Sequence, residues 1–231
     1  MMISPETYYE ECLQGKSQSA ILQQIGLLKK EIKRLKEVME SDKNSPEAMI
    51  MPSPLTRIKC NREYLEMAKL VLEEAGGQYE LTDEDLRDQS FNTKLAAMDR
   101  FTLEIGGFFN GYTKYKYTIS GDRVLFDADH SFYLKPSNLS VYEPFTREEF
   151  VRSIAALHIG EWKKRYENLC VLDGTQWSIS IEYEDGKEPF EIYGSNAYPY
   201  NFADLIDFLG IDNSDTDEMG DDYDAEEDEE R

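Results

Sequence analysis

The sequence of 231 residues contains little cysteine and histidine, three and two residues respectively. Cys12, Cys60 and Cys170 are odd in number, far apart and form no C-x-x-C pair, which argues against a disulfide framework and a cysteine zinc site. No apolar run approaches the roughly 18 residues of a membrane-spanning helix. The start, "MMISPETYYEE", lacks the basic and apolar regions of a signal peptide. We therefore expect a cytoplasmic protein without a membrane segment.

Basic charge is also scarce. The chain has 25 Lys and Arg against 47 Asp and Glu, a net charge of −22. Residues 212–231 hold twelve acidic residues and one arginine, and so account for −11 of that charge. Because binding to nucleic-acid phosphates depends on Lys and Arg, no direct nucleic-acid binding is expected. A basic protein partner is electrostatically allowed.

Apolar spacing predicts an antiparallel helical hairpin near the start of the chain. Ser4-Pro5 is typical of a helix start, and this short helix is expected to end at about Gln14. A longer helix follows from Ser17, with an apolar heptad seam at Ile21, Ile25, Leu28, Ile32, Leu35 and Met39. A loop with three prolines separates it from a helix predicted over residues 61–75.

A heptad seam can also pair two chains. An oligomer formed through residues 21–39 is therefore an alternative, unless the 61–75 helix covers the seam within the same chain. A further helix from Thr82 to about Asp99 completes a predicted helical region over residues 1–99.

The pattern changes from helix to strand at Arg100. Alternating apolar residues predict a strand near 101–105, two strands around Ser120-Gly121-Asp122, and a hairpin with its turn at Asp185-Gly186. Capping and apolar signals predict helices over 146–157 and 201–209. The predicted fold class is α+β: the helical hairpin, then an antiparallel β-sheet packed by helices over residues 100–211, and a disordered acidic tail over residues 212–231.

Gly15-Lys16-Ser17 matches the end of a phosphate-binding loop. The first glycine of that motif would fall at Glu10, whose carboxylate would repel phosphate, and the preceding segment is predicted to be helical. These residues are therefore interpreted as the boundary between two helices.

Asp127, Asp129 and His130 form the most compact set of candidate metal ligands. The two aspartates would share one face of a strand, where like charges need a cation or solvent. A metal site would need further ligands, and the other histidine is His158. A solvent-facing strand edge is the alternative, and no cofactor is predicted. Neither His158 with Cys170 nor a histidine with Ser195 completes a recognisable nucleophilic motif.

The stretch "YGSNAYPYNF" is the candidate binding segment. Tyr193, Asn196, Tyr198, Tyr200 and Asn201 follow a predicted strand and precede a helix. Tyrosines combine apolar bulk with a polar tip, which suits a recognition surface. The alternative is a structural loop whose aromatic rings cover the core.

The segments "FTLEIGGFFNGY", "LHIGEW", "VLDGTQW" and "IYGSNAYPYNF", together with the N-terminal helical sequence, resemble a family of uncharacterised bacterial proteins. The resemblance covers roughly residues 1–209. It implies a bacterial, cytoplasmic setting and transfers no activity, ligand or catalytic residue.

The sequence therefore favours a non-enzymatic protein-interaction or regulatory protein, for example an immunity-like or inhibitor-like protein that masks a basic partner. The alternative is a small-ligand or metal-dependent enzyme that uses the 127–130 or the 193–202 region.

Overall fold

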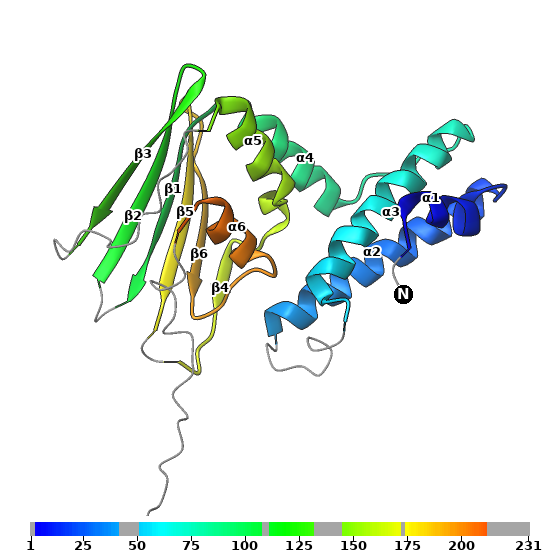
Figure 1. Cartoon of the computed structure of the whole chain (residues 1–231), viewed down its shortest axis with the longest axis horizontal. Coiled ribbons are helices and arrows are strands. Elements are labelled where there is room, and N and C mark those ends of the chain that lie inside the picture. The colour runs from blue at the N-terminus through cyan, green and yellow to red at the C-terminus, as the bar shows by residue number, and fades with distance from the viewer. Residues whose placement is uncertain (1–2, 42–50, 108–110, 132–144, 172–173, 212–231) are drawn as a thin grey trace, which may run out of the picture. The chain divides into compact units, whose positions relative to one another are not determined.

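A computed structural model describes residues 3–41, 51–107, 111–131, 145–171 and 174–211. The chain divides into two compact units (Figure 1). The helical unit comprises residues 1–86 with 199–201, and the sheet unit comprises residues 87–198 with 202–231. The acidic segment 212–231, predicted to be disordered, lies outside the described residues. The boundary between the units falls within a helix, thirteen residues before the predicted end of the helical region at Asp99.

The helical unit is built on the predicted hairpin. A short helix, α1 (Pro5–Tyr8), continues as a π-helical turn, η1 (Tyr9–Leu13), and is followed by α2 (Gln18–Ser41) and α3 (Pro54–Glu74). Helices α2 and α3 run side by side and antiparallel (Figure 1). Helix α3 begins seven residues earlier than predicted, because the Ser53 side chain caps it and Pro54 occupies its first position.

The heptad seam of α2 is buried within the chain. The buried residues of α2 are Ile21, Ile25, Leu28, Ile32 and Leu35, and those of α3 include Ile58, Leu65, Ala68 and Leu72. Because α3 covers the seam, the apolar stripe is satisfied without a second chain.

Basic residues of α2 hold the start of α4 (Asp83–Leu95). Lys29 Nζ lies 2.5 Å from Asp85 Oδ2, and Lys36 Nζ lies 3.1 Å from Glu84 Oε1. Burial acts to raise the pKa of Asp85, but hydrogen bonds from Lys29, Thr82 and Tyr79 outweigh it and hold that pKa well below its usual range.

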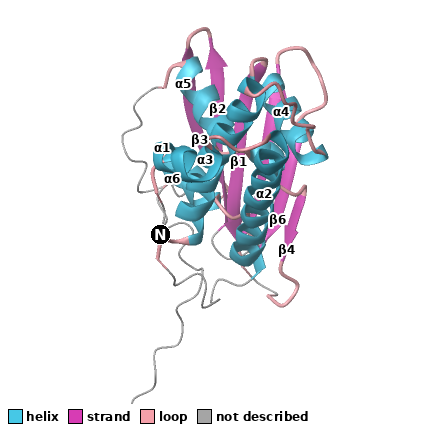
Figure 2. Ribbon diagram, turned by 90° about the vertical axis from the view of Figure 1, so that its right-hand side faces the viewer, coloured by secondary structure: helices cyan, strands magenta, loops and turns pink. Residues whose placement is uncertain are grey.

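The sheet unit contains six strands in the order β3-β2-β1-β5-β6-β4. The strands are β1 (Met98–Gly107), β2 (Gly111–Ser120), β3 (Arg123–His130), β4 (Arg165–Glu167), β5 (Gln176–Tyr183) and β6 (Phe190–Ser195). All neighbours are antiparallel except β4 and β6, which are parallel. Strand β4, at the sheet edge beside β6 (Figure 2), was not predicted because three residues are too short to show alternation.

One face of this sheet is covered by α5 (Arg147–Ala156), α6 (Phe202–Phe208) and the part of α4 that belongs to this unit (Figure 1). The predicted alternation of β5 is confirmed, with Trp177, Ile179, Ile181 and Tyr183 all buried. Within the described part of the sheet unit, no helix covers the opposite face, which is called the open face below (Figure 1). The predicted α+β class is therefore observed.

No helix in the described ranges has the length and apolar character needed to cross a membrane.

Candidate functional site

Polar side chains line up in rows across the open face. Strand register places one row from edge to edge of the sheet: Arg165, Tyr193, Ser178, Glu104, Lys114 and Asp129. A neighbouring row contains Glu167, Ser195, Gln176, Gly106 and Tyr112. Side chains that face each other across strands in this way interact directly.

These rows enclose a cavity of about 310 Å³. Small residues, such as Ser178 and Gly106, occupy the middle of the rows, while Tyr193 and Tyr112 stand on either side. The lining residues are Glu104, Tyr112, Arg165, Tyr166, Glu167, Gln176, Trp177, Ser178, Tyr193, Gly194 and Ser195. The cavity therefore results from the register of five strands rather than from a loop.

The charged groups of the cavity are paired with neighbours. Glu104 Oε2 lies 2.8 Å from Lys114 Nζ, and Arg165 Nη1 lies 3.0 Å from Glu167 Oε1. The Tyr193 hydroxyl donates a hydrogen bond of 3.0 Å to Glu191, and this bond raises the pKa of Tyr193. The cavity lining therefore combines aromatic rings with ion pairs that are accessible to solvent.

An apolar turn borders the cavity strands. Leu169 is 86% exposed and Val171 is 42% exposed. The turn is joined to β6 because Asn168 N donates to Ser195 O at 2.9 Å and Asn196 Nδ2 donates to Val171 O at 3.4 Å. Exposed aliphatic side chains therefore stand beside the polar cavity.

Of the five predicted binding residues, all described, Tyr193 lines the cavity and is 46% exposed. Asn196 has a φ of 54°, and its backbone amide bonds Thr175 O. Tyr198 stacks on Trp177 with ring centroids 6.2 Å apart, and burial raises the pKa of Tyr198.

The other two predicted binding residues are buried and group with the helical unit. Tyr200 and Asn201 are 8% and 5% exposed. The Tyr200 hydroxyl accepts a 2.9 Å hydrogen bond from Arg62, and Lys36 Nζ lies 5.4 Å from the Tyr200 ring centroid. The loop after Tyr193 therefore has mainly structural contacts.

The predicted metal ligands lie on β3, an edge strand of the sheet. Asp127 and Asp129 share the open face, as expected, and Asp127 Oδ2 lies 3.6 Å from Lys116 Nζ. Strand alternation places His130 on the opposite face. The three side chains therefore do not point to one centre.

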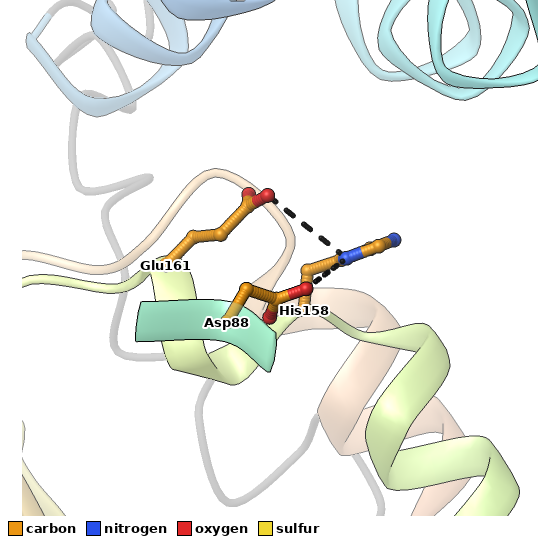
Figure 3. Close-up of side chains that lie close together, drawn as sticks. All are labelled: Asp88, His158 and Glu161. Carbon is orange, nitrogen blue, oxygen red and sulfur yellow. Dashed lines mark hydrogen bonds and ion pairs between the residues drawn. The ribbon is translucent and has the colours of Figure 1, made fainter. Parts of the chain in front are cut away.

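A different cluster joins Asp88 of α4 to His158 and Glu161 at the end of α5 and in the short helix η3 (Ile159–Glu161) (Figure 3). His158 Nδ1 lies 3.2 Å from Asp88 Oδ2 and 4.0 Å from Glu161 Oε1. One ligand atom from each residue lies within 4.8 Å of the others. No sequence pattern identifies Asp88, which is 70 residues from His158. The one sequence signal for this cluster is the close spacing of His158 and Glu161.

Close packing fixes the cluster. A Cβ at Gly160 would lie 2.9 Å from Asp88 Cα and 3.0 Å from Asp88 Oδ1, so glycine permits this approach. Asn92 Nδ2 donates to Asp88 Oδ2 at 3.2 Å. Asp88 Oδ1 is buried and has no hydrogen-bond partner among the described residues. His158 itself has a φ of 51°, which is uncommon for a residue other than glycine.

No family model, curated protein or solved structure matches the chain. The resemblance to uncharacterised bacterial proteins therefore stays a prediction, and function has to be inferred from the residues themselves.

Proposed function

We propose that this protein is a non-enzymatic binding protein that recognises a basic protein partner through the open face of its sheet unit. The cavity bounded by Tyr193 and Tyr112 carries the proposal. It is the hollow part of a sheet face that no described helix of this unit covers. Masking a basic surface in this way is the action of an immunity-like or inhibitor-like protein.

The cavity wall suits a guanidinium or ammonium group. Tyrosine ring faces attract cations, and Glu104 and Glu167 supply carboxylate acceptors. Both carboxylates already have basic neighbours, Lys114 and Arg165. Exposed pairs of this kind contribute only about 0–1 kcal/mol. A partner's arginine can therefore replace one of these neighbours at little cost.

The apolar turn beside the cavity supports a protein partner. Leu169 and Val171 expose aliphatic surface on a turn bonded to Ser195 and Asn196, and Ser195 lines the cavity. Protein interfaces use such mixtures of aromatic, apolar and polar groups. A small polar ligand would not need that turn.

Charge supports a basic partner. The chain carries −22, and half of this charge lies in residues 212–231. A strongly acidic segment raises the rate at which a basic protein is captured, and the effect falls with ionic strength. Association is therefore expected to slow as salt is added.

The test is capture from the source cell with the full-length protein, followed by titration of the captured partner. Tyr193→Ala should weaken binding about 30-fold, the effect of losing a central aromatic residue worth ~2 kcal/mol. Leu70→Ala is the matched control, since Leu70 is 57% exposed on α3 and belongs to the helical unit, not to the sheet unit. No captured protein at low or high salt, or equal capture by both variants, would contradict the proposal.

The alternative of a small-ligand enzyme is favoured by one observation. About 310 Å³ is at the lower end of ligand pockets, which span roughly 300–1,000 Å³. Leu169→Asp distinguishes the two functions, because a charged turn would weaken docking of a protein but leave a small ligand in the cavity unaffected.

A further inference from the structure

We propose that Asp88, His158 and Glu161 bind one divalent transition-metal ion, with Zn²⁺ as the ion of best fit. This inference goes beyond the proposed function and uses none of the residues of the open face. It concerns the helix-covered side of the sheet unit, where α4 meets the end of α5 (Figure 3).

The spacing of the ligand atoms suits one small ion. Zn²⁺ bonds nitrogen and oxygen at about 2.0–2.2 Å, so two ligands of a tetrahedral site are roughly 3.3 Å apart. The observed separations are 3.2 Å between His158 and Asp88 and 4.0 Å between His158 and Glu161. All three ligand atoms lie within 4.8 Å of one another, so side-chain rotations would bring them to bonding distance of one ion.

The donor atoms select the class of metal. One imidazole nitrogen with two carboxylate oxygens suits Zn²⁺ and related transition metals. Ca²⁺ and Mg²⁺ prefer sites made of oxygen alone. Three protein ligands also leave a coordination position for water or for another group.

Neighbouring contacts orient the side chain of Asp88 and constrain the backbone of His158. The ligand atom would be Asp88 Oδ2, which lies 3.2 Å from His158 Nδ1 and accepts a hydrogen bond from Asn92 Nδ2. A hydrogen bond of this kind orients a ligating carboxylate. The φ of 51° at His158 is a conformation that persists only where its surroundings hold it, and such conformations cluster at functional sites.

The first experiment is a competition titration of the full-length protein with Zn²⁺ and a chromophoric chelator, after removal of bound metal. One equivalent should bind. Asp88→Asn and His158→Ala should each weaken the affinity about 100-fold or more, since even partners of ligands cost 10–100-fold when removed. Asn92→Ala should fall within that 10–100-fold range.

His130→Ala is the matched control, because it removes the other histidine from β3. It should leave the affinity unchanged. Co²⁺ absorption of the wild type should show low-coordinate visible bands, which His158→Ala abolishes. The acidic segment 212–231 is common to all variants, so any weak binding to it cancels in the comparison.

Absence of a stoichiometric site would overturn the proposal, as would equal affinity in the wild type and Asp88→Asn. Equal losses in His130→Ala and His158→Ala would also overturn it. Asp88→Asn and Glu161→Gln preserve side-chain shape, so they keep the test decisive if His158→Ala fails to fold. Circular dichroism of each variant confirms its fold.

Discussion

Replacing Gly194 with alanine should destabilise the sheet unit by about 2–4 kcal/mol. Gly194 pairs with Trp177 across β5 and β6, and a Cβ at Gly194 would lie 2.0 Å from Nε1 and Cε2 of the Trp177 ring. Trp177 is 3% exposed, and its ring centroid lies 4.7 Å from that of Phe202. Its Nε1 donates a hydrogen bond of 2.9 Å to Ala197 O. Overpacking costs about 1–3 kcal/mol and loss of that hydrogen bond about 1 kcal/mol.

Urea unfolding followed by tryptophan fluorescence measures this effect. Both tryptophans, Trp162 and Trp177, belong to the sheet unit, and their ring centroids lie 6.5 Å apart. The fluorescence signal therefore reports on the unfolding of that unit. The control is Gly26→Ala in α2, where an added Cβ meets no atom within 4 Å. That change should stabilise the helical unit by about 0.8–1 kcal/mol, measured by circular dichroism. A free energy of unfolding for Gly194→Ala within about 0.5 kcal/mol of the wild type would refute the packing of Trp177 over Gly194.

Three further substitutions test an ion pair, a buried hydroxyl and a strained backbone position. Asp85→Asn should lower the free energy of unfolding by about 2–3 kcal/mol near pH 7. Because the pKa of Asp85 is depressed in the folded state, this loss should shrink as pH falls below the unfolded pKa of about 4. Urea unfolding at several pH values measures the change. Tyr8→Phe should be neutral or stabilising by up to about 1 kcal/mol, since the buried hydroxyl has no hydrogen-bond partner among the described residues. Burial raises the pKa of Tyr8 to about 12, so above about pH 10 the tyrosine ionises more readily in the unfolded chain and the wild type loses stability. The Phe variant should not show this loss. With chelator present, His158→Gly should be more stable than His158→Ala by about 1–2 kcal/mol, because glycine accepts a φ of 51°; equal stabilities would show that the backbone relaxes.

Elements with several periodic residues were predictable from the sequence. The seam of α2 and the alternation of β5 each repeat often enough to identify their buried face. The sequence pattern predicts the start of α3 at about Asn61, because Pro52 and Pro54 are typical of a loop. Ser53 with Pro54 was in fact the cap and first residue of the helix.

The sites depend on contacts that no local pattern reveals. Tyr193 was identified by composition, but the cavity around it needs the register of β4, which is too short to predict. Asp88 reaches His158 through packing at Gly160. By contrast, the separation of His130 from Asp127 follows from strand alternation, which the sequence already contained.

The two proposed sites are physically separable. Tyr193 lines the cavity of the open face. His158 lies at the end of α5 beside Asp88 of α4, on the helix-covered side of the same sheet unit (Figure 3). An ion at His158 would link α4 to the end of α5 and stabilise the unit by preferring the folded state. Such an ion would change partner affinity only if it bound the free and the partner-bound protein with different affinities. If Zn²⁺ alters partner binding through His158, some element of the sheet unit must exchange between two arrangements, and the effect of the partner on Zn²⁺ affinity must be equal in size.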